Sequence, residues 1–129
     1  MVELWYFDFP GRAEAIRDTL RLGGIPFVDK RIAMEEFRNR REAGDLPWDT
    51  LPVLVTERGE RLGQSNAILR WAGRHAGLYP DVPEQAADVD GVLDAAEDLG
   101  GRVSTSIRVA SPAVREALRE ELCRGWIPA

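Results

Sequence analysis

The chain has few of the residues that define several functional classes: its 129 residues include one cysteine and one histidine. Cys123 cannot form an internal disulfide, and without a Cys-x-x-Cys pair the chain lacks the motif of thiol-disulfide oxidoreductases. No apolar run is long enough to span a membrane, and the N-terminal residues lack the basic segment of a secretory signal. We therefore expect a cytoplasmic protein in a reducing compartment, with Cys123 as a small buried residue of an apolar helix.

Positive charge is also scarce: 17 Lys and Arg residues against 22 Asp and Glu residues give a net charge of -5 at pH 7. The chain has no long basic stripe, so we expect neither nucleic acid nor an anionic membrane as a partner. Asp90, Asp94 and Asp98 lie four residues apart in an acidic segment. Their spacing does not match a calcium-binding loop and favours a solvated helix face, so we predict no metal site.

The first 76 residues show alternating strand and helix patterns. Apolar runs predict strands, recurrence at helical spacing predicts helices, and the glycines at 23 and 24 end the first helix. The predicted strands cover residues 2–7, 26–32, 52–56 and 61–62, and the predicted helices cover 12–22 and the residues from 65 on, with a short helix or irregular excursion at 34–43. The order βαβαββα predicts an α/β fold, with a thioredoxin-like N-terminal domain built on a mixed four-stranded sheet.

A segment with two prolines separates this part from a helical remainder. We predict a domain at 1–76, a linker at 77–85, and the start of an all-helical C-terminal domain at 86–129. Apolar residues keep helical spacing over 89–107, where Gly100 and Gly101 mark a possible weak point. A second helix is expected to begin at Ser111-Pro112 and to continue through Trp126. Because two helices cannot cover all the apolar surface they present, we expect this C-terminal domain to be incomplete.

The segment from Leu51 to Trp71 combines features that suit a bound anion. Leu51 precedes Pro52, so it is biased to extended conformations, and the Leu51-Pro52 bond is a candidate for the cis isomer. Ser65 is the predicted N-cap of the following helix. The N-terminus of that helix would offer free N–H groups and the positive end of its dipole, with Gln64 and the Ser65 hydroxyl as further partners for a carboxylate.

Three segments together resemble the cytosolic glutathione S-transferase family, in its tyrosine-type, sigma-like branch. They are Tyr6 to Glu14 (Tyr-Phe-Asp-Phe-Pro-Gly-Arg-Ala-Glu), Leu51 to Leu54, and Gln64 to Arg70, and the resemblance extends from Met1 to about Leu99. It implies that the N-terminal domain binds glutathione, that the helical domain completes a pocket for a small hydrophobic electrophile, and that the protein is a homodimer. Relatives carry several more helices, so the chain is expected to be a fragment or a natural short form.

The resemblance assigns catalysis to Tyr6. A hydrogen bond donated to the glutathione sulfur would stabilise the thiolate, and Arg12 would support its charge. On the strand pattern alone, Tyr6 is a core aromatic, and Arg12 is an exposed helix charge. Phe7, Phe9 and Pro10 are expected to line the electrophile pocket.

The remaining contacts to glutathione are also implied by the resemblance. Leu51 and Pro52 would hold the cysteinyl part, and Gln64 and Ser65 the γ-glutamyl carboxylate; ordinary helix capping is the alternative for the last two. Asp98 would reach the amine of the glutathione bound by the partner subunit.

At the glycyl carboxylate of glutathione, relatives often have a tryptophan and then a lysine. This chain offers Phe37 and Arg41 instead, with Arg40 as a rival to Arg41. Arginine can bind a carboxylate through two donors, whereas a solvated basic helix face explains these residues equally well.

We therefore expect a glutathione transferase that activates the glutathione thiol for conjugation to a hydrophobic electrophile or for isomerisation of one. The alternative is a weakly active or non-catalytic module that keeps the fold and binds glutathione or another protein. The absence of further helices and the altered region around Phe37 favour this alternative.

Overall fold

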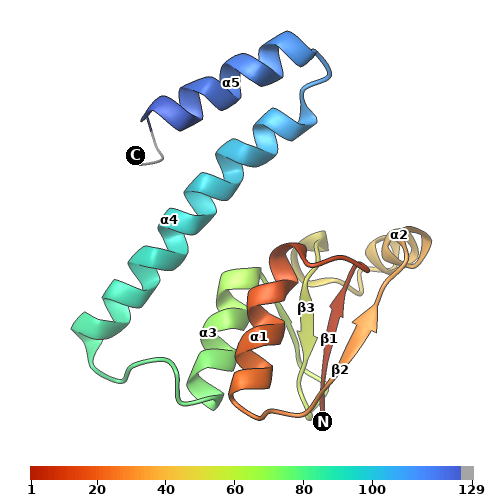
Figure 1. Cartoon of the computed structure of the whole chain (residues 1–129). Helices are drawn as coiled ribbons and strands as arrows, with labels where there is room; N and C mark the ends of the chain where they lie inside the picture. Colours follow the sequence, from red (N-terminus) through yellow and green to blue (C-terminus); the bar gives the residue numbers. More distant parts are fainter. Residues whose placement is uncertain (126–129) are drawn as a thin grey trace. The chain divides into compact units, whose positions relative to one another are not determined.

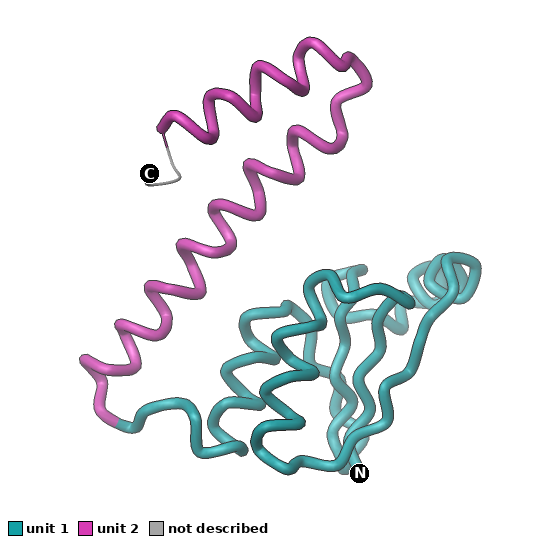
Figure 2. Tube along the Cα trace, in the orientation of Figure 1, with its two compact units in different colours: residues 1–81 teal, residues 82–129 magenta. Residues whose placement is uncertain are grey.

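The computed structural model describes residues 1–125, and the chain divides into two compact units, the first comprising Met1–Asp81 and the second beginning at Val82 (Figures 1 and 2). The first unit contains a sheet and three α-helices among its described residues. Its elements are β1 (Val2–Tyr6), a 3-10 turn (Gly11–Ala13), α1 (Glu14–Leu22), β2 (Phe27–Arg31), α2 (Met34–Glu42), a second 3-10 turn (Pro47–Asp49), β3 (Val53–Val55), β4 (Arg61–Gly63) and α3 (Ser65–His75). This order confirms the predicted α/β, thioredoxin-like fold.

The sheet has the strand order β2-β1-β3-β4. β1 pairs with β2 in parallel, while the β1–β3 and β3–β4 pairs are antiparallel, so the described strands form the predicted mixed sheet. A parallel neighbour requires a crossover connection, and α1 supplies it. The two antiparallel pairs bring the start of β3 and the end of β4 to the edge of the sheet where β1 ends.

Side chains of β1 alternate between two cores because successive residues of a strand point to opposite faces. Leu4 and Tyr6 pack in one cluster with Ile16 of α1 and Ile68 of α3. The helices α1 and α3 lie side by side on this face of the sheet (Figure 1). Trp5 faces the other side and packs in a second cluster. That cluster contains Ile32, Leu46 and Val53, with Phe37, Leu51 and Val55 against it.

Several predicted boundaries in the first unit are wrong by one or two residues. β1 ends at Tyr6 and not at Phe7, and α1 begins at Glu14 because the residues from Gly11 to Ala13 form a 3-10 turn. Ser65 is the first residue of α3 and not its N-cap; Gln64 holds the N-cap position at φ 71°. β4 ends at Gly63 and α3 begins at Ser65. The chain therefore reverses direction at Gln64, the one residue between them.

The second unit is a pair of helices, α4 (Pro83–Arg108) and α5 (Pro112–Gly125). α4 begins at Pro83, inside the predicted linker, because proline is well tolerated in the first turn of a helix, where no intrahelical N–H bond is lost. Gly100 and Gly101 do not interrupt it. Cys123 is exposed on α5, so the prediction of a buried cysteine is wrong. Trp126, expected on the same helix, lies outside the described residues.

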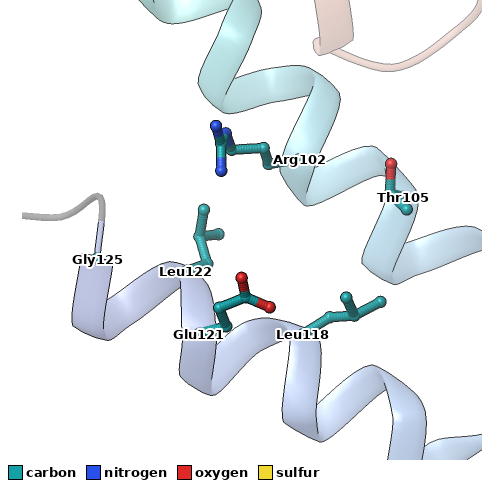
Figure 3. A pocket seen from close by; sticks show the side chains of 6 residues that line it. All are labelled: Arg102, Thr105, Leu118, Glu121, Leu122 and Gly125. Atoms are coloured by element: carbon teal, nitrogen blue, oxygen red, sulfur yellow. The ribbon is translucent and has the colours of Figure 1, made fainter.

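A hollow of about 360 Å³ lies between α4 and α5 (Figure 3). Arg102 and Thr105 come from α4, while Leu118, Glu121, Leu122 and Gly125 come from α5. This hollow contains none of the residues predicted to bind glutathione.

Neither a membrane span nor a metal cluster is found among residues 1–125. No helix in this range is long and apolar enough to cross a bilayer, and the range holds no group of three His, Cys, Asp or Glu side chains that could bind a metal ion.

Candidate functional site

The register of the sheet brings three of the predicted site residues to one edge. Trp5 pairs with Val53, and Val53 pairs with Gly63 on its other side. One position further along the same antiparallel ladders are Tyr6, Pro52 and Gln64. Residues far apart in the sequence therefore meet at one edge of the sheet, at the end of β1, just before β3 and just after β4.

The Tyr6 phenol is placed so that its own hydrogen can be donated. Its side chain is buried in the core next to α1 and α3, and its exposed fraction is 5%. The backbone N–H of Arg12 donates to its Oη at 3.1 Å. Because Oη accepts this hydrogen bond, its O–H remains available to donate, and polarisation along the chain of bonds strengthens that donor.

Gly11 makes this arrangement sterically possible. Its φ is +46°, a left-handed conformation that glycine adopts at little cost. A Cβ at this position would lie 2.6 Å from Tyr6 Oη and 2.7 Å from Phe9 Cε2, closer than atoms of these types approach. The turn therefore needs a glycine for its conformation and for the space that the phenol occupies.

The peptide bond between Leu51 and Pro52 is cis, which confirms that prediction. Leu51 is half-buried and packs against both core clusters, so its backbone is fixed between the two faces of the sheet. Trp48 and Asp49, which precede it, both have positive φ values, 59° and 53°. A tight approach holds this turn against β4, because a Cβ on Gly63 would lie 2.8 Å from Trp48 Cδ1.

The N-terminus of α3 lies next to this edge and has features that suit an anion. Gln64 has a positive φ of 71° and makes no side-chain hydrogen bond that caps the helix, and no acidic residue stands in the first turn. The N–H groups of that turn lack intrahelical partners, and the positive end of the dipole is not compensated by a local carboxylate. A carboxylate bound at Ser65 would satisfy both.

Aromatic side chains form a continuous group beside Tyr6. Phe7 and Phe9 are stacked, with ring centroids 5.7 Å apart and planes at 6°, and both contact Tyr6 edge-on. Phe37 of α2 contacts Phe7 at 5.4 Å. The structure thus joins two of the three residues predicted for the electrophile pocket to Tyr6 and Phe37, both predicted to bind glutathione. The third, Pro10, is exposed on the following turn. Half of Phe9 is exposed (51%), so the group presents an apolar surface to solvent.

The two arginines considered for the glycyl carboxylate have different surroundings. Arg40 forms ion pairs with Glu36 at 2.8 Å and with Asp45 at 3.6 Å, and its guanidinium lies over the Trp5 ring. The Arg41 side chain is exposed and, among residues 1–125, makes no hydrogen bond or ion pair. A cation that already has two carboxylate partners has less to gain from a third, so the geometry favours Arg41.

Two further predicted site residues are Arg12 and Asp98. The Arg12 backbone supports Tyr6, whereas its side chain is exposed. Asp98 is an exposed residue of α4 in the second unit. Their roles toward glutathione stay predictions.

Sequence reasoning did not identify Arg17, whose side chain is fully buried (0% exposed) behind the Tyr6 turn. Its position carried a signal, since it lies four residues after Ala13 and three before Leu20 on the apolar stripe of α1. A charged residue on such a stripe is rarely buried without partners. Trp48 was also missed, because nothing in the local sequence indicates a left-handed tryptophan.

Comparison with known proteins gives consistent similarities. No protein-family profile matches the chain. Glutathione S-transferase 1 of Ascaris suum is 34% identical over 83% of this chain and 50% of its own length. The solved structure of prostaglandin synthase D of Nilaparvata lugens is 30% identical, with a TM-score of 0.85 over 97% of this chain and 61% of that chain. A sigma class glutathione S-transferase of Fasciola hepatica is 29% identical, with a TM-score of 0.78 over 96% of this chain and 60% of that chain.

The chain spans about half to three fifths of the length of these relatives. The two solved structures match 97% and 96% of this chain. Similarity of this extent in sequence and in structure shows that the chain belongs to the glutathione S-transferase family.

Proposed function

We propose that this chain binds glutathione at the edge formed by Tyr6, Leu51-Pro52 and the N-terminus of α3, and that it activates the thiol for attack on a hydrophobic electrophile. The observation that carries the proposal is the hydrogen bond from the Arg12 N–H to Tyr6 Oη. It leaves the phenol O–H available as a donor at the end of β1, at the same edge of the sheet as the N-terminus of α3, which suits a carboxylate.

The chemistry follows from the charge on sulfur. A free thiol has a pKa of about 8.5 and is mostly protonated at neutral pH, and only its thiolate is a good nucleophile. A hydrogen bond donated by Tyr6 stabilises the thiolate and lowers the thiol pKa. The thiol loses its proton to solvent, and the thiolate forms a carbon–sulfur bond with the electrophile. The leaving group departs with the electron pair of the bond that breaks. In an isomerisation, the same sulfur adds and is later expelled.

Holding the tripeptide is a separate task from activating it. An extended cysteinyl segment can pair with the backbone of Leu51 as an added strand, because this residue lies just before β3 at the open end of the ladder. The γ-glutamyl carboxylate would meet Gln64, Ser65 and the first N–H groups of α3. The stacked Phe7 and Phe9 rings offer an apolar surface for the electrophile next to the sulfur.

Calorimetric titration with glutathione, paired with a conjugation assay on a chromogenic nitroaryl chloride, tests the proposal. We expect saturable binding with one site per chain and turnover above the uncatalysed rate. Binding without turnover would favour the alternative of a non-catalytic binding module. Absence of glutathione binding would contradict the proposed function, both as a conjugating and as an isomerising enzyme.

Replacing Arg41 by alanine should weaken glutathione binding about threefold to tenfold, because an exposed charge pair contributes roughly 1 kcal/mol. The matched control is Arg38→Ala, on the same exposed helix, which should leave affinity nearly unchanged. Binding of γ-glutamylcysteine, which lacks the glycine, should not respond to Arg41→Ala. Equal weakening of both ligands would show that Arg41 does not meet the glycyl carboxylate.

We also propose that the chain forms a homodimer in the cytoplasm, as the family resemblance implies. The single cysteine supports a reducing compartment. Analytical ultracentrifugation over a range of concentrations tests the dimer: a monomer at all concentrations would contradict it. If Asp98 contacts glutathione in the partner subunit, affinity should rise with protein concentration in the wild type and not in Asp98→Ala.

A further inference from the structure

The side chain of Arg17 donates hydrogen bonds to main-chain carbonyls of the turn between Tyr6 and Gly11. Its Nη1 donates to the carbonyl of Phe9 at 3.3 Å and to the carbonyl of Pro10 at 3.2 Å. The guanidinium carbon lies 5.8 Å from the centroid of the Tyr6 ring. One buried side chain therefore contacts the phenol that is proposed to act on sulfur and the two residues that precede Gly11.

Two acidic residues fix the guanidinium in this position. Glu14 of α1 accepts from Arg17 Nη1 at 2.8 Å, and Asp29 of β2 accepts from Arg17 Nε at 3.2 Å. Asp29 also pairs with Arg31 at 2.6 Å, and Arg31 donates to the Phe7 carbonyl at 3.5 Å. Arg17 and Arg31 thus both donate to main-chain carbonyls of the turn, and the Asp29 carboxylate links the two arginines.

Stability alone is a poor explanation for a buried arginine at this site. Its Nη2 is buried and has no hydrogen-bond partner among the described residues. An unsatisfied buried donor is costly, and a hydrophobic residue of similar volume often serves a core at least as well as a buried ion pair. Both acidic partners have a second cation, since Glu14 also contacts Arg21 at 3.6 Å and Asp29 contacts Arg31. The contribution specific to Arg17 is the pair of hydrogen bonds to the Phe9 and Pro10 carbonyls.

We propose that Arg17 is a positioning residue for the proposed thiol activation: it fixes the Phe9–Pro10 turn so that the Arg12 N–H meets Tyr6 Oη. This inference rests on the proposed function for its effect on catalysis. Its structural part, the dependence of the Tyr6–Arg12 hydrogen bond on Arg17, holds independently of glutathione.

Arg17→Met keeps much of the volume and removes the donors, and Arg17→Lys keeps the charge without the fork that reaches two carbonyls and Asp29. The control is Arg21→Met, which removes an exposed arginine from the same helix. Amide hydrogen exchange measured by NMR reports the Arg12 N–H directly, with the amides of β1 and β3 as internal references. The pH profile of conjugation reports the bound thiol.

In Arg17→Met we expect exchange of the Arg12 amide to accelerate about tenfold or more, since the loss of one hydrogen bond is roughly a tenfold effect, while the references stay protected. The acid limb of the kcat/KM profile should move to higher pH, because a less stabilised thiolate forms at a higher pH. Arg17→Lys should give an intermediate result, and Arg21→Met should match the wild type.

Unchanged Arg12 exchange and an unchanged pH profile in a folded Arg17→Met would overturn the inference. If that variant does not fold, the same two criteria apply to Arg17→Lys. Failure of the proposed function is distinguishable, because a wild type that binds no glutathione still reports through the Arg12 amide.

Discussion

Replacement of Tyr6 by phenylalanine is expected to lower kcat/KM for conjugation about a hundredfold, because removal of one donor to a stabilised anion costs about that factor. The ring and its edge contacts with Phe7 and Phe9 would remain, so the loss would come from the hydroxyl alone. Steady-state kinetics at neutral pH measures the effect. Glutathione affinity should change little, since backbone groups and the α3 N-terminus make the other proposed contacts.

Tyr79→Phe is the matched control because Tyr79 is the other tyrosine of the chain and lies outside the candidate site. It should retain wild-type kinetics. Because kcat/KM reports the loss only if the chemical step is rate-limiting, the reaction should be measured with a slow electrophile. A Tyr6→Phe variant with wild-type kcat/KM would show that the hydroxyl does not stabilise the thiolate.

Replacement of Gly11 by alanine is the second change with a large expected effect. The new methyl group would collide with Tyr6 Oη and Phe9, as the distances of 2.6 Å and 2.7 Å show. The phenol must then move or the turn must open, and either change breaks the hydrogen bond from the Arg12 N–H. We expect a loss of kcat/KM of at least about tenfold and a fall in the free energy of unfolding of roughly 1–3 kcal/mol, the usual cost of a strained backbone.

Gly44→Ala separates the two causes of that effect. Gly44 also has a positive φ, +70°, but a Cβ there would meet nothing within 4 Å. This control should lose some stability from backbone strain and should keep its activity. Chemical denaturation and steady-state kinetics on both variants give the comparison. Equal activities in Gly11→Ala and Gly44→Ala would show that the space around Tyr6 Oη is not critical.

The sequence predicted those parts of the fold that depend on local patterns. Apolar runs and helical spacing located the strands and helices of the first unit, and the residue before Pro52 indicated the extended segment that enters β3. The resemblance brought together Tyr6, Pro52 and Gln64, which the register of the sheet places at one edge. This register could not be derived from the pattern, because it depends on which strands pair.

The errors have physical causes that are not visible in a local window. Ser65 has the composition of an N-cap, but the chain reversal after β4 falls on Gln64, whose positive φ no polar pattern predicts. Cys123 follows an apolar residue on a helix, yet its side chain is exposed. Burial of Arg17 on α1 required knowledge that Asp29, on β2, lies beside it. Each of these depends on tertiary contacts.

The account depends most on one claim, that the chain binds glutathione as a thiolate held by Tyr6. Ultraviolet difference absorbance of the thiolate, recorded during a pH titration of the glutathione complex, tests it directly in the wild type and in Tyr6→Phe. We predict that the bound thiol of the wild type ionises well below the value of about 8.5 for a free thiol, and that Tyr6→Phe returns it to that value. Equal ionisation in the two proteins, or a wild-type thiol that titrates like free glutathione, would contradict the account.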